Sequence, residues 1–576
     1  MLSNAIGDFF VRKISKIGAE IHAVVIDQSA VDMVPADVKF PADKLSALTS
    51  FKKLSDEDVR ALVTKSAKSY CALDPMPMTL LLDCLDVVLP VISYLVNSSL
   101  VHGYFPMDWK EALVKPLLKK PGLEAQFKNL RPLSNLQFIS KLAERSAYEQ
   151  TYYHLITHNL IPELQSAYRK RYSTETALLK VQNDILLNMD RQHVTLLVLL
   201  DLSAAFDTVN HDILLRRLET TFGITGTALQ WFSSYLGNRS QRVVFGDGVS
   251  ESFYLACGVP QGSCLGPLLF TLYASKLFEV IKHHLPSAHA YADDTQLYVS
   301  FKPDCSASEA ECFSAMEKCI RAVRAWMIQD KMKLNDDKTE FLIIGTSQQL
   351  KKVRTDTLSV GDAVISPVLS ARNLGAYFDS NMTLVPFINN TCKSAFSQLY
   401  NIRRIRKYLT TDTSKTLVHA MITSRIDYCN SLLCGLPDNS LNKLQRVQNA
   451  AARLITGTAK FSHITPVLRS LHWLPIKQRV QFKMLILIFK AINGLAPNYI
   501  SNLVNILCPS KYLLRRNNEI LLEPYNGKTK KTLGDRAFAV AAPRLFNSLP
   551  REIRHETCFN TFKTKVKTFL FRMAFC

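Results

Sequence analysis

Two adjacent carboxylates, Asp293 and Asp294, lie inside a run of residues that favours a β-hairpin. Tyr291 and Ala292 precede them, and residues 295–299 follow with the sequence Thr-Gln-Leu-Tyr-Val. Acidic side chains are depleted in strands, and neighbouring like charges repel each other more strongly where water is excluded. A divalent cation removes this conflict, because hard cations bind carboxylate oxygens. The pair is therefore a candidate metal ligand, and the alternative is an ordinary exposed Asp-Asp turn.

A third carboxylate, Asp201, comes directly after a run of apolar or β-favouring residues, 194–200. A short continuous apolar run is typical of a strand buried on both faces, so Asp201 is expected at the end of a central strand. Residues 211–218 follow as a predicted helix. If this strand end meets the Asp293–Asp294 hairpin, the carboxylates converge on one place. Such a group can hold two metal ions about 3.5–4 Å apart and clamp both oxygens of a phosphoryl transfer.

A loop rich in glycine and proline, residues 258–267, lies between the two acidic segments. It opens an apolar, helix-like stretch at residues 268–273. Glycine allows a backbone to approach a ligand closely, and exposed N–H groups at a helix start favour anions. The loop is thus a candidate wall of the same site, and the alternative is a plain loop before a core helix.

In this order, the three elements resemble the central motifs of reverse transcriptases, and they are most similar to those of non-LTR (LINE-type) retrotransposons of the jockey and chicken-repeat kind. The motifs are residues 201–207, 258–267 and 291–294. Flanking segments are similar to further blocks of the same family, namely residues 129–134, 165–177, 332–339 and 374–379. The likeness runs from about residue 73 to about residue 575, so it covers most of the chain.

The resemblance implies an α+β fold of the right-hand polymerase type, with a mainly helical, basic C-terminal region. It divides the chain into an N-terminal connector at 1–70, fingers and palm at 71–380, and thumb with a basic C-terminal extension at 381–576. Complete elements of this kind usually carry an endonuclease before the polymerase. About 70 residues are too few for such a domain, so we expect the chain to lack it.

Metal binding and phosphate chemistry follow from the same resemblance. Asp201, Asp293 and Asp294 are expected to bind two Mg²⁺ ions, with Mn²⁺ as a substitute and the Leu202 carbonyl as an extra ligand. Lys338 is expected to donate a proton to the leaving pyrophosphate, because a cation there stabilises developing charge. Its alternative is a solvated lysine after a turn.

Nucleotide selection is expected from another group of residues. Phe206 lies where the family has a bulky steric gate that collides with a ribose 2′-hydroxyl, so the product should be DNA. Its alternative is plain core packing. Gln261 and Gly262 are expected to contact the template nucleotide and the nascent pair, and Arg131 to hold the triphosphate.

Composition is that of a globular protein of several domains, with 576 residues of which 47% are hydrophobic. No secretory signal is visible, and the longest apolar candidate, residues 79–96, contains Asp83, Asp86 and Pro90. We interpret it as a core helix rather than a membrane span. The 13 cysteines form no Cys-x-x-Cys pair, which favours free thiols in a reducing compartment, so a nuclear or cytoplasmic location is expected.

Positive charge is concentrated in the C-terminal third. Residues 401–576 hold 29 basic and 8 acidic residues, which equals the whole net charge of +21. Basic groups occur at residues 403–407, 511–516, 528–531 and 563–567. Aromatic residues such as Trp473, Phe482 and Phe489 are interleaved with them. The imbalance favours salt-sensitive binding to phosphate backbones, although any single charge run is usually a solvated surface.

The leading hypothesis is an RNA-directed DNA polymerase that extends a DNA primer on an RNA template with deoxynucleoside triphosphates. It has no membrane partner, and the sequence leaves its oligomeric state open. The alternative is a truncated or repurposed, non-catalytic protein that binds RNA or RNA–DNA hybrids. A weaker alternative is a polymerase that copies DNA.

Overall fold

The computed structural model describes residues 2–24, 32–35, 39, 47–66, 71–120, 122–361, 363–507, 519–527, 529 and 532–575. The chain forms two compact units that interleave in sequence. The first comprises Met1–Tyr168, Asp201–His284 and Lys318–Lys338, and the second comprises Arg169–Leu200, Leu285–Glu317 and Thr339–Cys576.

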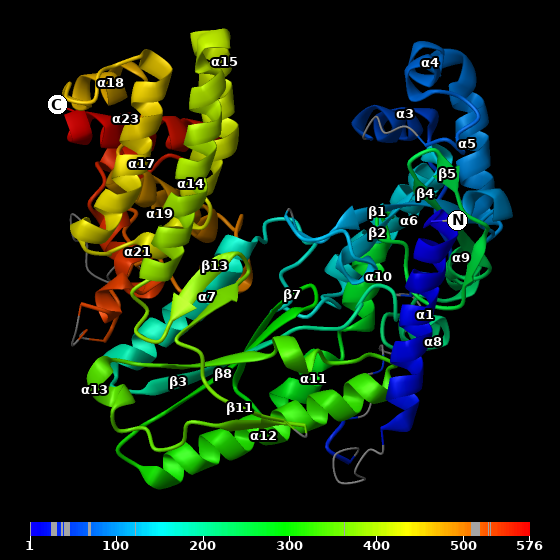
Figure 1. Cartoon of the computed structure of the whole chain (residues 1–576), viewed down its shortest axis with the longest axis horizontal. Coiled ribbons are helices and arrows are strands. Elements are labelled where there is room, and N and C mark those ends of the chain that lie inside the picture. The colour runs from blue at the N-terminus through cyan, green and yellow to red at the C-terminus, as the bar shows by residue number, and fades with distance from the viewer. Residues whose placement is uncertain are drawn as a thin grey trace. The chain divides into compact units, whose positions relative to one another are not determined.

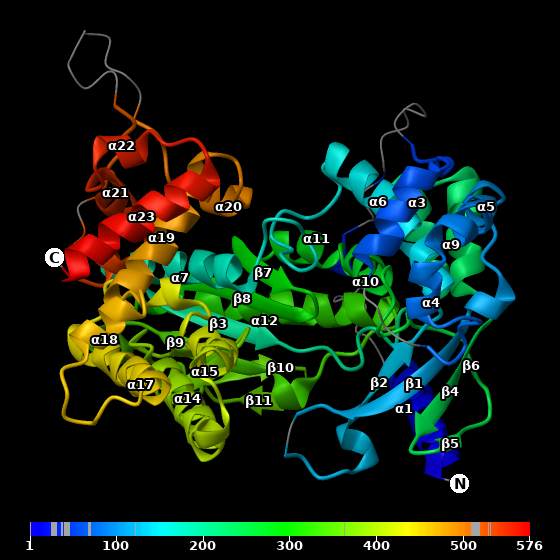
Figure 2. The ribbon, with the colours of Figure 1, turned by 90° about the horizontal axis from the view of Figure 1, so that it is seen from above.

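The first unit contains a five-stranded sheet in the order β2-β1-β4-β5, with β6 also paired to β4. Its strands are β1 (Glu111–Leu118), β2 (Leu130–Asn135), β4 (Arg239–Phe245), β5 (Gly248–Val249) and β6 (Phe253–Leu255). β1 is antiparallel to β2 and parallel to β4. The N-terminal helix α1 (Leu2–Ala23) packs against β4, β5 and β6, as Figures 1 and 2 show. Ile6 and Phe10 of this helix join Val114 and Val243 of the sheet in one apolar cluster.

Helices form the rest of the first unit around an aromatic core. They are α3 (Asp56–Lys65), α4 (Met78–Asp83), α5 (Leu85–Val101), α6 (Phe138–Thr157), α8 (His211–Thr220), α9 (Gly226–Leu236), α10 (Gly266–Tyr273) and α11 (Leu277–Lys282). Phe105 meets Trp231 edge-on with ring centroids 5.4 Å apart, and Trp231 stacks on Tyr235. The helix predicted at 211–218 is confirmed, and the Asn210 side chain caps it by accepting the Ile213 N–H.

The apolar segment at 79–96 differs from the expected single core helix. It forms α4 and α5, which meet at Cys84. α5 packs against α3, α6 and α9, but Val87, Val91 and Tyr94 on its other side are exposed. Periodicity alone did not separate the buried from the exposed side, because both are apolar. No helix in the described ranges has the length and apolarity needed to span a bilayer.

The second unit is built on a four-stranded antiparallel sheet in the order β7-β8-β3-β9. Its strands are β3 (Val194–Leu200), β7 (Ser287–Tyr291), β8 (Asp294–Phe301) and β9 (Glu340–Ile344). Two small hairpins follow, β10 (Leu358–Val360) with β11 (Ala363–Ile365) and β12 (Ser370–Asn373) with β13 (Ala376–Asp379). Both predicted strand features, the apolar run before Asp201 and the hairpin at Asp293, are confirmed. β3 is central, and all its residues except Leu199 are buried.

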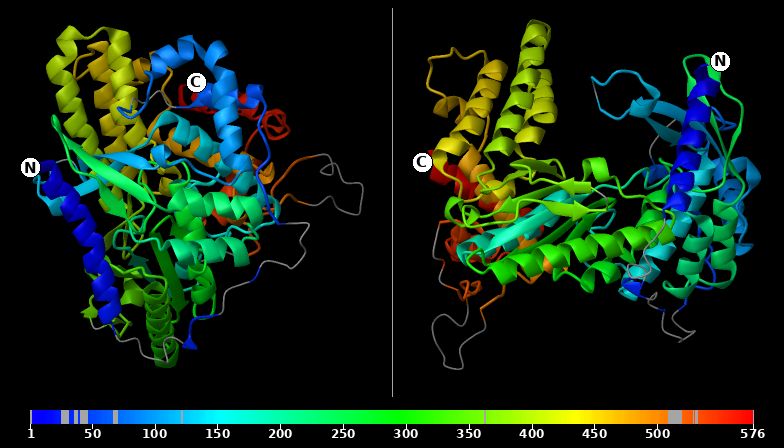
Figure 3. Two further views of the ribbon diagram at one scale, coloured as in Figure 1. Left: turned by 90° about the vertical axis from the view of Figure 1, so that its right-hand side faces the viewer. Right: turned by 60° about the horizontal axis from the view of Figure 1, so that its bottom comes forward.

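Helices make up the rest of the second unit. They are α7 (Thr174–Asp190), α13 (Ser347–Leu350), α14 (Val385–Ile405), α15 (Thr411–Val418), α16 (Ser424–Ile426), α17 (Asp438–Thr456), α18 (Thr465–Ser470), α19 (Ile476–Ile492), α20 (Asn498–Ser501), α21 (Phe538–Asn547), α22 (Arg551–Arg554) and α23 (Phe559–Phe575). α12 (Ser306–Gln329) begins in this unit and ends in the first. α7 packs against β3 and β7, and α20 and α21 pack against α7. α14 and α17 lie side by side, the yellow-green and yellow helices of Figure 3.

Candidate active site

Asp201 begins the segment that follows β3, and its carboxylate is already held by two donors. The Lys338 ammonium and the Asn335 side-chain amide both donate to Oδ2, each at 2.9 Å. Lys338 keeps 67% of its side chain exposed, so this ion pair is screened by water and contributes little to stability. Asn335 is a residue that the sequence did not single out.

The backbone at Leu202 leaves one carbonyl directed away from its neighbouring segment. Leu202 and Leu334 form an isolated antiparallel bridge, flanked by the hydrogen bonds Asn335 N–H to Asp201 O and Ser203 N–H to Lys333 O, both 2.9 Å. In such a non-hydrogen-bonded pair, the N–H and C=O groups of the two facing residues point outward. The Leu202 carbonyl is therefore not used by this bridge.

Asp293 and Asp294 occupy the turn and the first strand position of the β7–β8 hairpin. Tyr291 pairs with Asp294, so Ala292 and Asp293 form a two-residue turn. Ala292 has φ of +59°, in the left-handed region that alanine enters at a cost of about 1–2 kcal/mol. Asp294 is exposed and Asp293 is half-buried. Strained turns of this kind are concentrated at functional sites.

Metal-binding chemistry fits the residue types of Asp201, Asp293 and Asp294. Within the described ranges, no group of three His, Cys, Asp or Glu side chains is arranged to hold a metal ion. The donors offered by Asp201, Asp293 and Asp294 are hard carboxylate oxygens, which suit Mg²⁺ or Mn²⁺. At Asp201 a bound cation would repel the Lys338 ammonium on Oδ2, so metal binding weakens this ion pair.

Phe206 is a fixed, half-buried ring in the segment after Asp201. It stacks on Phe270 of α10, with ring centroids 4.9 Å apart and an angle of 24° between the planes. The Phe206 carbonyl also accepts the Val259 N–H at 2.9 Å, which ties the segment to the glycine-rich loop. The ring thus has the rigidity that a steric gate needs.

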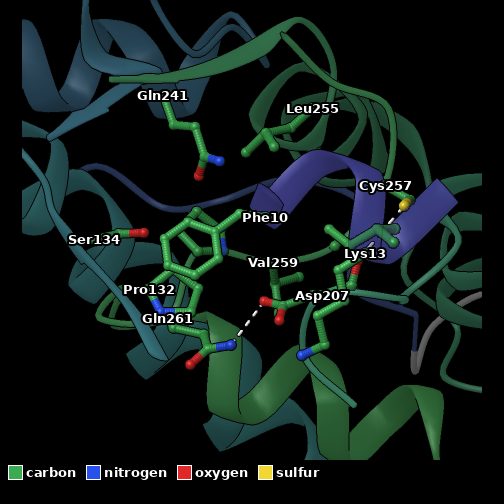
Figure 4. Close-up of a pocket in the computed structure, with 13 residues that line it drawn as sticks. Phe10, Lys13, Pro132, Ser134, Asp207, Gln241, Leu255, Cys257, Val259 and Gln261 are labelled. Atoms are coloured by element: carbon green, nitrogen blue, oxygen red, sulfur yellow. Dashed lines mark hydrogen bonds between the residues drawn. The ribbon is translucent and has the colours of Figure 1, made fainter. Parts of the chain in front are cut away.

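The glycine-rich loop lies close to neighbouring segments at both Gln261 and Gly262. The Gln261 carbonyl accepts the Ser134 N–H at 2.8 Å, and its side-chain amide donates to Asp207 Oδ1 at 2.7 Å (Figure 4). Gly262 has φ of +130°, and a Cβ there would overlap the Ser134 carbonyl. Glycine at 262 is therefore required by the close approach of strand β2. Asp207 stood in the recognised motif, but the sequence assigned it no role.

A buried carboxylate that the sequence did not reveal, Glu144, supports the start of α10. Its Oε2 accepts the N–H groups of Cys264 and Leu265 at 2.6 and 3.2 Å. Glu144 is 0% exposed, and burial raises the pKa of its carboxyl group. The available signal was an acidic residue on the apolar face of the helical stretch that became α6.

Three cations of the first unit, Lys13, Lys119 and Arg131, act on Asp207, and Lys338 adds to the positive charge near Lys119. Lys119 is exposed, but partial desolvation of its amine lowers its pKa, and the charges of Lys13, Lys338 and Arg131 lower it further. Arg131 was predicted to hold the triphosphate and Lys338 to donate a proton to pyrophosphate, whereas Lys13 in α1 and Lys119 after β1 were not predicted to act. Neither of these two stands in a recognisable local pattern, so only the fold reveals them.

The C-terminal basic region divides into structural and exposed cations. Arg406 donates to the carbonyls of Leu454 and Ile455, so its charge caps α17. The aromatic interpretation needs correction, because Trp473 and Phe489 are 7% and 1% exposed and belong to the core. The basic residues at 511, 515, 516, 528, 530 and 531 lie outside the described residues.

Exposed aromatic and basic side chains do meet on one side of α14. Phe396, Tyr400, Arg403 and Arg404 follow helical spacing in α14, Lys407 comes in the 3-10 turn Arg406–Tyr408 directly after it, and all five are exposed. We call these five residues the α14 basic face. Its mixture of rings and cations is typical of surfaces that bind nucleic acid.

The chain is similar to known RNA-directed DNA polymerases, both in a family match and in individual relatives. Residues 118–377 match the family described as reverse transcriptase (RNA-dependent DNA polymerase). The chain is 26% identical over 400 residues to "Probable RNA-directed DNA polymerase from transposon BS" of Drosophila melanogaster, covering 68% of this chain and 43% of that protein. It is 24% identical over 399 residues to "RNA-directed DNA polymerase from mobile element jockey" of the same organism, covering 67% and 42%. The chain therefore spans less than half the length of these relatives.

Proposed function

We propose that this chain, which carries a reverse transcriptase domain over residues 118–377, is the RNA-directed DNA polymerase of a non-LTR retrotransposon. It would add deoxynucleotides to a DNA 3′-hydroxyl while copying RNA. The two units would supply the fingers, palm and thumb of a right-hand polymerase. The single observation that carries the proposal is the strand register at the acidic hairpin.

In that register, Asp201 and Asp294 are each bonded to a residue of the last pair at the same end of the β3–β8 ladder. Leu200 of β3 pairs with Thr295 of β8. Asp201 is bonded to Leu200, and Asp294 is bonded to Thr295. Consecutive Cα atoms are about 3.8 Å apart and ladder partners about 4.5–5.5 Å apart, so the Cα atoms of Asp201 and Asp294 are within roughly 13 Å. Covalent geometry thus keeps these carboxylates near each other.

Divalent metals are typical cofactors of this family, and Asp201, Asp293 and Asp294 would hold two Mg²⁺ ions with the Leu202 carbonyl. When bound, the ions supply a lowered pKa for the primer hydroxyl and charge compensation at the phosphates. Lys338 would leave Asp201 when metal binds, which frees its ammonium for the leaving pyrophosphate.

Nucleotide binding would use the remaining residues of the first unit. The Phe206 ring, held by Phe270, would exclude a ribose 2′-hydroxyl. Gln261 and Gly262 would contact the template base and the nascent pair. Arg131 and Lys119 would attract the triphosphate, because several cations close together favour a polyanion.

Template and primer binding would involve the α14 basic face of the second unit. Exposed rings such as Tyr400 can stack on bases or sugars, and Arg403, Arg404 and Lys407 can contact phosphates. A second candidate function is therefore binding of RNA or RNA–DNA hybrids without catalysis. The exposed rings and cations of the α14 basic face are the observation that favours this alternative, because such a surface can bind nucleic acid without chemistry.

Primer extension on purified protein separates the two functions. The protein would receive an RNA template, a labelled DNA primer, deoxynucleotides and Mg²⁺, with Asp293→Asn as the test variant. Asp304→Asn is the matched control, since Asp304 is 67% exposed and pairs with Lys352 on the surface. We expect extension by the wild type and the control, and loss of at least about 10³-fold in Asp293→Asn and in EDTA. Tight hybrid binding without extension by the wild type would establish the non-catalytic alternative.

A further inference from the structure

The N-terminal helix α1 is anchored to the first unit near both of its ends. Near the start, Gly7 lies so close to the ring of Phe253 in β6 that a Cβ would overlap it. Near the end, Glu20 forms an ion pair with Lys333 at 2.6 Å. These contacts give the middle of the helix a defined position.

The middle of α1 lines a pocket shared with the glycine-rich loop. Phe10 and Lys13 come from the helix, and Asp207 and Gln261 come from the segments that carry the predicted nucleotide contacts. Figure 4 shows the Lys13 side chain extending from α1 toward the Asp207 carboxylate, with the Gln261 amide on the other side. Within the part of the chain that the structure describes, Lys13 is half-buried and forms no ion pair.

The protonation state of Asp207 decides how the side-chain amide of Gln261 is oriented. An ionised carboxylate only accepts hydrogen bonds, so it must receive the NH₂ end of the Gln261 amide, as it does at 2.7 Å. The carbonyl end of Gln261 is then turned away from Asp207. A protonated Asp207 could donate instead, and the amide could flip. The same aspartate is packed tightly on its backbone side, where Cys257 Sγ donates to the Asp207 carbonyl at 3.5 Å.

The charge around Asp207 favours the ionised state against the effect of burial. On balance the pKa of Asp207 is raised, because burial outweighs the lowering by the Gln261 hydrogen bond and then by the charges of Lys13, Arg131 and Lys119. Arg131 and Lys119 are exposed, so water and salt screen them, whereas Lys13 is half-buried. Lys13 is therefore the cation whose influence depends most on the fold.

We propose that Lys13 and Asp207 are positioning residues for Gln261, so that α1 is a working part of the nucleotide site and not only a connector. This inference rests on the proposed polymerase function. The charge of Lys13 favours the ionised form of Asp207 against burial, ionised Asp207 holds the amide of Gln261 in one orientation, and Gln261 meets the incoming pair with its carbonyl end. The three residues belong to α1, to the segment after Asp201 and to the glycine-rich loop.

Steady-state primer extension at varied deoxynucleotide concentration tests whether Lys13 acts on Gln261 through Asp207. For Lys13→Met we expect the KM for deoxynucleotide to rise roughly three- to tenfold, with kcat within about twofold, the size expected for coupled residues of one network. The acid limb of kcat/KM should move to higher pH, and Lys13→Arg should restore both values. Lys16→Met on the same helix is the control, because Lys16 is 78% exposed. Identical kinetics for Lys13→Met and Lys16→Met would overturn the inference.

A second measurement does not depend on turnover. Lys13→Met, Asp207→Asn and the double variant form a cycle that is read by denaturant unfolding midpoints. We expect the effect of Lys13→Met to disappear once Asp207 is neutral, because the charge it compensates is gone. Additive midpoint shifts would refute the coupling. If the wild type failed to extend a primer, the polymerase function would be wrong, and the cycle would still decide whether Lys13 acts on Asp207.

Discussion

Replacing Gly262 with alanine perturbs the predicted nucleotide site through one added methyl group. The new Cβ would lie well inside 3.0 Å of the Ser134 carbonyl, a separation that real Cβ atoms essentially never show. Ser134 belongs to strand β2, so its carbonyl cannot swing away as a side chain could. The loop and the strand must therefore separate by more than about half an ångström.

Two costs add up at this position. The φ of +130° at Gly262 suits glycine alone, and a side chain there costs about 1–3 kcal/mol. Separating loop and strand stretches the 2.8 Å hydrogen bond from Ser134 N–H to the Gln261 carbonyl, worth about 0.5–1.5 kcal/mol. The sum of about 1.5–4.5 kcal/mol is below the whole stability of a typical protein, so the variant should fold. A shift of Gln261 by this amount should lower kcat/KM about 10- to 100-fold.

Gly246→Ala is the matched control for this experiment. Gly246 has a positive φ of +60°, but no heavy atom lies within 4 Å of the Cβ position, so only backbone strain of about 1 kcal/mol is added. Both variants would be compared in RNA-templated primer extension, with the folded fraction measured by circular dichroism. If folded Gly262→Ala kept kcat/KM within twofold of Gly246→Ala, the claim that this loop positions the nucleotide would be refuted.

Three further predictions concern the gate, the basic face and a buried histidine. Phe206→Ala should raise ribonucleotide incorporation at least about tenfold in extension assays, while Phe206→Tyr keeps the ring and the selectivity; unchanged sugar selectivity would contradict the gate. Replacing Arg403, Arg404 and Lys407 by Gln should reduce the slope of log K against log salt by about 2–3 in filter binding to a hybrid; an unaltered slope would exclude the α14 basic face as a phosphate contact. Burial, with a smaller contribution from the charge of Lys180, lowers the pKa of His289 to about 3. This histidine therefore binds a proton at lower pH in the folded protein than in the unfolded chain. Stability should fall by up to about 1.4 kcal/mol per unit as pH drops below about 6.5, and urea titrations of His289→Phe should show a shallower decline.

Charge substitution is preferable to truncation in the basic region. α20 and α21 pack against α7, so removing residues 401–576 would expose the core of the second unit. Replacing Lys563, Lys565 and Lys567 on α23 is the control for charge number. Lys565 already pairs with Glu556 at 2.7 Å, so this variant should change the salt slope less than the α14 substitutions do.

Local pattern was sufficient for several elements of the site. The apolar run at 194–200 predicted β3, and the strand-favouring residues on both sides of Asp293 and Asp294 predicted the β7–β8 hairpin. Both signals are strong because side-chain periodicity and β-propensity act within a few residues. The role of Gly262 was likewise visible as a glycine in a loop, although the reason for it, the Ser134 carbonyl, was not.

Long-range packing determined the features that the sequence did not reveal. Trp473 and Phe489 looked like rings among cations, yet both are core residues. Arg406 looked like part of a basic cluster, yet it caps α17 through two carbonyls. In each case burial depends on which distant helix covers the residue, and no window of neighbouring residues contains that information.

The sequence by itself determined the order of motifs, the strand and hairpin that carry the acidic residues, and the uneven distribution of charge along the chain. Each of these follows from the residues nearest in the chain. Tertiary structure alone decided that Glu144 caps the loop helix and that Lys13 faces Asp207. Those pairings join residues more than a hundred positions apart, and they exist because apolar burial brings their helices against the same sheet and loop.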